Sequence, residues 1–178
     1  SLVRGLLAAG AGRVTFVDNL LTGREENLEE VRGSVELIRA DIRNYAELAA
    51  ALRGAGTVFH LAAIPSVPRS ISDPVPSHEV NVDGTFNVLR ACAEGGVRRV
   101  VYAASSSAYG GSEVLPKVES MAPDPRSPYA AQKLAGEYLA RTFHLCFGVE
   151  TVSLRYFNVY GPRQDPSSPY SGVLSLFI

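Results

Sequence analysis

The sequence predicts an α/β fold in which a doubly wound parallel sheet is covered by helices on both faces. Short runs of nearly continuous apolar residues alternate along the chain with longer segments of helical periodicity. Such runs are typical of parallel strands, because those strands are buried on both faces. Polar residues also follow most of the runs directly, and ligands of doubly wound sheets bind beyond the carboxyl ends of the strands.

The first half of the chain contains three predicted strands and two predicted helices. In order, these are a helix over 2–10, strands over 13–18 and 34–40, a helix over 44–54 and a strand over 57–63. Gly10 and Gly54 are suited to end the two helices, because glycine adopts the left-handed conformation found at many helix ends. Asn44 is suited to be the N-cap of the second helix.

Prolines mark the element boundaries in the second half. A turn-rich stretch with Pro65, Pro68, Pro74 and Pro76 leads into a helix over 81–96, which is followed by a strand over 98–106, a proline-containing loop, a long helix from about Pro128 to Phe147 and a strand over 149–157. Strands and helices therefore alternate along the whole chain, as in doubly wound sheets.

Composition indicates one globular domain with an ordinary surface. The chain has 178 residues, 46% hydrophobic and 20% charged, and a formal net charge of -1. This balance predicts neither a nucleic-acid partner nor an anionic membrane surface, and no apolar run approaches the ~20 residues that span a bilayer. Cys92 and Cys146 lack CxxC or Cys/His spacing, and the three histidines fit no ligand motif. We therefore expect no metal site, no disulfide and a cytoplasmic location.

Tyr129 and Lys133 stand four residues apart at the start of the long predicted helix. Residues at this spacing share a helix face. The two side chains could be an ordinary surface pair. They could also form a proton-transfer unit, in which the cation lowers the phenol pKa from about 10 by roughly 1–3 units and brings a general base closer to neutral pH.

Asp18 ends the first predicted strand. It could be a simple turn residue. In dinucleotide-binding βαβ units, however, an acid about 20 residues after a glycine fingerprint binds the adenosine ribose and disfavours NADP. No such fingerprint is present, because the chain begins where the preceding strand and its turn would end. We therefore expect the first strand and the glycine-rich turn of the sheet to be missing from this chain.

Three serines, Ser105–Ser107, follow the fourth predicted strand. They could form a polar turn, or one hydroxyl could relay a proton, since a serine both donates and accepts hydrogen bonds. A G-x-S-x-G elbow is absent from the sequence, which disfavours serine-hydrolase chemistry.

Seven segments in order carry a family resemblance. They are VDNLLTG (17–23), Asp41-Ile42, HLAA (60–63), NVDGT (81–85), SSSAYG (105–110), YAAQK (129–133) and RYFNVYGPRQ (155–164). With them the chain resembles the extended short-chain dehydrogenase/reductases, specifically the NAD-dependent nucleotide-sugar epimerases and dehydratases. The resemblance implies a Rossmann-like fold and NAD as cofactor.

The resemblance also implies roles for individual residues. The catalytic group would be Ser105, Tyr129 and Lys133. The cofactor would be bound by Asp18 and Asn19 at the adenosine ribose, by Asp41 and Ile42 at the adenine edge, by the backbone of Leu61, Ala62 and Ala63, and by Asn81, Tyr129, Lys133 and Tyr156. The substrate would contact Ser105, Ser106, Tyr129 and Asn158.

Within the family, the serine segment favours epimerases over dehydratases. Dehydratases resemble T-D-E-x-Y-G there and use the acids to eliminate water, whereas this chain has Ser105, Ser106 and Ser107. The implied activity is epimerisation of a UDP-hexose at C4 through a transient 4-keto intermediate. The sugar stays open between glucose, N-acetylglucosamine and a uronate. A nucleotide-sugar reductase or decarboxylase and a non-catalytic NAD-binding regulatory domain are the alternatives.

The resemblance gives expectations for domains and assembly as well. Residues 1–165 would form the NAD-binding domain, incomplete at its N-terminus, and residues 166–178 would begin a truncated substrate-binding region. The full-length protein would be a homodimer that acts on a UDP-sugar.

Overall fold

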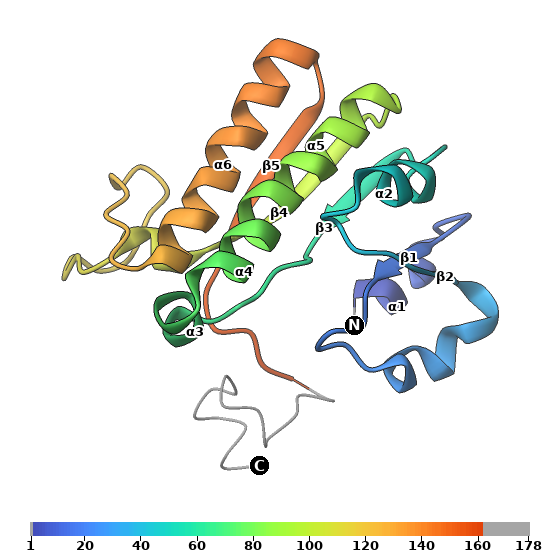
Figure 1. Ribbon diagram of the computed structural model, residues 1–178, viewed down its shortest axis with the longest axis horizontal. Helices are drawn as coiled ribbons and strands as arrows, with labels where there is room; N and C mark the ends of the chain where they lie inside the picture. The colour runs from blue at the N-terminus through green and yellow to red at the C-terminus, as the bar shows by residue number, and fades with distance from the viewer. Residues whose placement is uncertain (1, 162–178) are drawn as a thin grey trace.

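The computed structural model describes residues 2–161 of the chain (Figure 1). Its elements, in order, are α1 (Leu2–Ala8), β1 (Thr15–Asp18), the 3-10 helix η1 (Glu25–Ser34), β2 (Glu36–Arg39), α2 (Tyr45–Ala51), β3 (Thr57–His60), α3 (Val67–Ser72), α4 (Pro74–His78), the π-helical turn η2 (Glu79–Gly84), α5 (Thr85–Glu94), β4 (Arg99–Ser105), the 3-10 turn η3 (Ser106–Tyr109), α6 (Pro128–Phe147) and β5 (Glu150–Tyr156). All five predicted strands are present. Residues 166–178, predicted to begin a substrate-binding region, lie outside the described residues.

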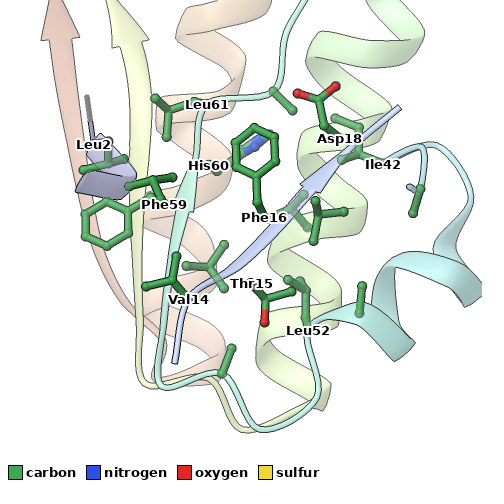
Figure 2. A pocket seen from close by; sticks show the side chains of 18 of the residues that line it. Leu2, Val14, Thr15, Phe16, Asp18, Ile42, Leu52, Phe59, His60 and Leu61 are labelled. Carbon is green, nitrogen blue, oxygen red and sulfur yellow. The ribbon is translucent and has the colours of Figure 1, made fainter. Parts of the chain in front are cut away.

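The strands form two parallel sheets rather than one. β1 pairs with β2, with Thr15 opposite Glu36, and β3, β4 and β5 pair in that order, with Val58 opposite Val100. Placed in the nucleotide-binding strand order 3-2-1-4-5-6, these five strands occupy every position except that of the first strand. A cavity of about 1040 Å³ runs between the edges of β1 and β3, and Phe16 and Phe59 are among its lining residues (Figure 2).

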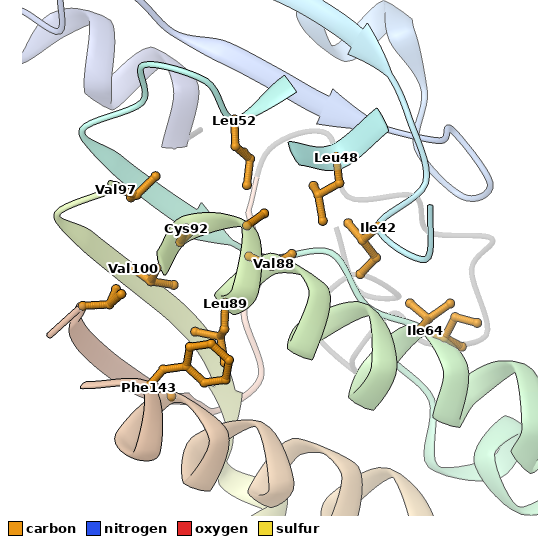
Figure 3. Packing of buried hydrophobic residues seen from close by; sticks show 14 residues of the cluster. Ile42, Leu48, Leu52, Ile64, Val88, Leu89, Cys92, Val97, Val100 and Phe143 are labelled. Carbon is orange, nitrogen blue, oxygen red and sulfur yellow. The ribbon is translucent and has the colours of Figure 1, made fainter. Parts of the chain in front are cut away.

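Helices α5 and α6 pack side by side on one face of the three-stranded sheet (Figure 1). Their apolar side chains meet those of α2 and β4 in a single buried cluster that includes Leu48, Val88, Leu89, Val100 and Phe143 (Figure 3). Burial alternates along β4, as the pleat of a strand requires. Against the expectation of strands buried on both faces, Phe59, Val152 and Leu154 remain partly exposed on the opposite side.

The turn-rich segment before residue 79 is more regular than predicted. It forms the two short helices α3 and α4, each with a proline in its first turn. Proline is tolerated there because its missing N–H would have no helical partner. Ser66 caps α3 by accepting a hydrogen bond from the Arg69 N–H at 3.0 Å.

None of the helices in the described part of the chain is long and apolar enough to cross a membrane.

Candidate active site

The N-terminus of α6 places Tyr129 and Lys133. Ser127 caps the helix by accepting a hydrogen bond from the Ala130 N–H at 3.1 Å, and Pro128 occupies the first turn. The Tyr129 N–H, which has no partner within the helix, donates to the Ser70 hydroxyl of α3 at 3.0 Å. Two serine hydroxyls from different segments therefore hold this helix end in place.

Tyr129 lies next to the end of β4, with its phenol near the Ser105 hydroxyl. The pKa of Tyr129 is raised, because burial disfavours the phenolate, while the neighbouring Ser105 hydroxyl acts in the opposite direction. The expectation of a lowered pKa was therefore wrong for the side chain in this environment. Helical spacing does not reveal how deeply a tyrosine is buried.

Lys133 is one turn further along α6 and only 4% exposed. Its Nζ donates to the backbone carbonyl of Ala103 at 2.8 Å and lies 5.1 Å from the centre of the Tyr102 ring. Burial lowers the pKa of Lys133 to about 8. A largely protonated amine thus lies at the carboxyl end of β4 at neutral pH.

The remaining predicted substrate residues, Ser106 and Asn158, and the predicted cofactor residue Tyr156 lie around the same strand ends. Ser106 begins η3, directly after β4. Tyr156 is the register partner of Ser105 on β5, and Asn158 follows it in an exposed segment. The structure thus brings the ends of β4 and β5 together, as the parallel sheet predicts.

Arg155 ties the two strand ends to α6. Its guanidinium forms an ion pair with Glu137 at 2.9 Å and lies 4.8 Å from the centre of the Tyr109 ring. The Tyr109 ring in turn stacks with Phe157 at a centroid distance of 6.2 Å. The sequence analysis did not predict this ion pair. Glu137 and Arg155 are 18 residues apart, which places the acid on a helix and the base on the strand that follows it.

Asp18 and Asn19 form a tight turn at the end of β1. Asp18 Oδ1 accepts the Leu20 N–H at 2.7 Å, and Asn19 Oδ1 accepts the Leu21 N–H at 3.0 Å. Leu20 adopts a left-handed φ of 56°, a conformation that is uncommon for a residue with a side chain. These bonds fix the orientation of both side chains.

The Asp41 carboxylate is saturated by donors from the chain. Its Oδ1 accepts the backbone N–H and Nε of Arg43 at 2.9 and 3.0 Å, and its Oδ2 accepts Nη2 of Arg43 at 2.8 Å and Nδ2 of Asn19 at 2.9 Å. The bidentate pairing with Arg43 holds the pKa of the Asp41 carboxyl well below its usual range. A carboxylate has about four lone-pair sites, so this side chain joins the ends of β1 and β2. Arg43 was missed from sequence.

Asn81 is also used internally. It is 1% exposed; its Oδ1 accepts the Ile64 N–H at 2.8 Å, and its Nδ2 donates to the Ile64 carbonyl at 3.2 Å and to Gln132 Oε1 at 2.9 Å. Ser77 donates to the same Gln132 oxygen at 2.8 Å. Asn81 therefore fixes the segment after β3 against α6, and neither Gln132 nor Ser77 was predicted.

The predicted residues form two groups. The first group lines the cavity beside β1 and β3 and consists of Asp18, Asn19, Asp41, Ile42 and Leu61–Ala63; Asp18, Ile42 and Leu61 are labelled in Figure 2. The second group, Ser105, Tyr129 and Lys133, lies at the end of β4. His60 lies between the groups, because it lines the cavity and its ring centre is 5.5 Å from that of Tyr102. Both cysteines are free, and the described residues contain no cluster of three metal-ligating side chains.

A parallel sheet with an acid at one strand end and a serine, a tyrosine and a buried lysine at another is the arrangement of a short-chain dehydrogenase/reductase. More specifically, the chain belongs to the NAD dependent epimerase/dehydratase family, whose model matches residues 1–178.

Relatives and solved structures agree on this family. The chain is 41% identical to a UDP-glucose 4-epimerase from Mycolicibacterium smegmatis over 99% of its length and 57% of that protein. It also matches a Thermus thermophilus UDP-glucose 4-epimerase in complex with NAD, with a TM-score of 0.87 and 41% identity over 95% of this chain and 54% of that one. A UDP-N-acetylglucosamine 4-epimerase from Methanobrevibacter ruminantium gives a TM-score of 0.87 and 40% identity over 93% and 53%. The chain thus spans little more than half the length of these proteins.

Proposed function

We propose that this chain forms the NAD-binding and catalytic part of a UDP-sugar 4-epimerase, with residues 1–165 as the cofactor domain. The observation that carries the proposal is the group at the end of β4, in which the Ser105 hydroxyl neighbours the Tyr129 phenol and the buried Lys133 lies one turn away along α6. The names of the similar proteins support the same activity.

Tyr129 would exchange the proton of the sugar 4-hydroxyl. As a phenolate it accepts that proton, and as a phenol it returns it to the 4-oxygen after the 4-keto sugar has presented its opposite face. Ser105 donates a hydrogen bond that favours the phenolate and orients the 4-oxygen. Lys133, protonated at neutral pH with a pKa of about 8, adds a positive charge that favours the phenolate as well.

The residues around the cavity fit NAD, which supplies the hydride acceptor and donor in this chemistry. Asp18 Oδ2 faces Gly23, and a Cβ at position 23 would lie only 3.2 Å from this oxygen. Glycine at position 23 therefore leaves room for a ribose hydroxyl beside the Asp18 carboxylate. Because the Asp41 carboxylate is saturated, we assign the adenine edge to the backbone at Ile42, and Asp41 and Asn81 to the support of that wall. Leu61–Ala63, Tyr156 and Lys133 complete the proposed cofactor site.

Elimination of water needs an acid and a base that act on the sugar. Positions 105–107 carry only hydroxyls, which favours epimerisation over elimination. Ser106 and Asn158 are the proposed substrate contacts beside Ser105 and Tyr129. We further propose a cytoplasmic homodimer; light scattering of the purified protein tests the dimer.

The test is Tyr129→Phe, which removes only the phenolic oxygen. We expect kcat for UDP-hexose epimerisation to fall by ~10²–10⁴-fold, as for other positioned acid–base groups, with bound NAD and unfolding midpoint unchanged. Tyr138→Phe is the matched control, since Tyr138 lies on the same helix and is exposed. Full activity in Tyr129→Phe would reject the proposed mechanism, and a product altered in composition or redox state would point to a reductase or decarboxylase.

A further inference from the structure

We propose that Ser107 is a positioning residue for the reaction: its hydroxyl and backbone N–H fill both lone pairs of Ser105, so that the single Ser105 proton is directed at Tyr129. This inference rests on the proposed function, because it concerns the proton exchange at Tyr129.

Two contacts join the serines. Ser107 Oγ lies 2.8 Å from Ser105 Oγ, and the Ser107 N–H donates to the same oxygen at 3.2 Å. The second contact is the side-chain cap of η3, whose N-cap is Ser105. The turn that follows β4 therefore places the Ser107 hydroxyl against Ser105 through its own backbone geometry.

The direction of these bonds follows from counting donors. A serine hydroxyl has one proton and two lone pairs, and the Ser107 N–H always occupies one lone pair of Ser105. When Tyr129 is a phenolate it can only accept, so the Ser105 proton must point at it. The remaining lone pair of Ser105 must then accept the Ser107 proton, which gives one possible order: Ser107 to Ser105 to Tyr129.

This order is coupled to the charge on Tyr129. A neutral phenol can donate to Ser105, which reverses the chain and turns the Ser105 proton towards Ser107. Ser107 therefore stabilises the phenolate selectively, as a second member of a hydrogen-bonded chain that polarises the first. The titratable groups near these hydroxyls are Lys133 on α6, whose Nζ donates to the Ala103 carbonyl, and Tyr102 on β4. Burial raises the pKa of Tyr102, and the charges of Tyr129 and of Glu137 on α6 act in the same direction.

The experiment compares Ser107→Ala with Ser107→Thr in the NAD-loaded protein. We expect Ser107→Ala to lower kcat at neutral pH by about 2- to 10-fold, the range of one neutral hydrogen bond, with KM unchanged. The loss should shrink at higher pH, because the phenolate then forms without help. Ser107→Thr keeps the hydroxyl and should restore wild-type kcat and its pH profile.

A second readout does not depend on epimerase activity. The ultraviolet phenolate titration of Tyr129, isolated by subtracting the Tyr129→Phe protein, should move to higher pH in Ser107→Ala and return in Ser107→Thr. An unchanged titration in Ser107→Ala, or a Thr variant that behaves like the Ala variant, would overturn the role of Ser107. A shifted titration in a protein that epimerises no UDP-sugar would reject the proposed function and still support the positioning of Ser105.

Discussion

Gly136 lies in the interior of α6, where glycine normally weakens a helix. Replacing it with alanine should gain about 0.5–1 kcal/mol from helix propensity alone. A Cβ at this position, however, would lie 2.8 Å from Tyr102 Cε1 and closer still to Cζ and Oη. Tyr102 is 1% exposed and packed between β4 and α6, so its ring has no free space to enter.

In Gly136→Ala, the cost of crowding Tyr102 should exceed the gain in helix propensity. Inserting a methyl group into a filled core costs about 1–3 kcal/mol, because side chains or backbone must shift. We expect Gly136→Ala to lower the free energy of unfolding by about 1–2 kcal/mol after the propensity gain. Since the Tyr102 hydroxyl also donates to the Lys133 carbonyl at 3.4 Å, the same shift should displace Lys133 and reduce kcat.

Urea unfolding of two alanine variants measures this. Gly5 lies in helix α1, and a Cβ there meets nothing within 4 Å, so Gly5→Ala should keep the full propensity gain and raise stability. In Gly136→Ala, the additional change Tyr102→Leu should relieve the crowding and restore part of the lost stability. If Gly136→Ala proved as stable as Gly5→Ala, the close approach of β4 and α6 would play no part in selecting glycine.

Two further predictions concern the cofactor wall and its neighbour. Gly23→Ala should turn the Asp18 carboxylate, 3.2 Å from the new Cβ, and weaken NAD binding by about 3- to 10-fold through a distorted charge-assisted hydrogen bond; calorimetry with NAD checks this, and wild-type affinity would contradict it. Burial lowers the pKa of His60 from 6.5 to about 3, so the unfolded chain binds more protons between these values and stability falls as pH drops below 6.5. At pH 5 the loss attributable to His60 is about 2 kcal/mol. His60 Nε2 lies 2.9 Å from the Thr85 hydroxyl, so His60→Gln keeps a donor for it and should show a flatter dependence of stability on pH in urea unfolding between pH 7 and 5. A slope identical to wild type would refute the assignment.

The sequence was most informative where local chemistry decides the outcome. The predicted bounds of α6, from about Pro128 to Phe147, agree with the structure. Local chemistry explains them, because Ser127 caps the helix and Gly148 ends it with a left-handed φ of 74°. The strands followed from apolar runs, and the pairing of Asn44 with the first turn of α2 followed from its residue type.

What could not be predicted depends on contacts between distant segments. Two of the prolines that suggested turns, Pro68 and Pro74, sit in the first turns of α3 and α4. Ser70 of α3 contacts Tyr129 from 59 residues away in the sequence. Asn81 was assigned to the cofactor site from the family resemblance. In the structure its amide is matched by the backbone of Ile64, a partner that only the folded chain brings into reach.

The pairing of β1 with β2 and of β3 with β4 and β5 has a consequence for cooperativity. Within the described residues no strand of one sheet pairs with a strand of the other. The β1–β2 pair can therefore separate without breaking any backbone hydrogen bond of the β3–β4–β5 sheet. Amide protons of the two ladders therefore need not exchange with solvent in the same opening event. The residues proposed to bind adenosine, Asp18 and Ile42, follow the strands of one sheet, and the proposed catalytic group lies at the end of β4 in the other. A ligand that contacts both groups would therefore couple the unfolding of two sheets that share no backbone hydrogen bonds.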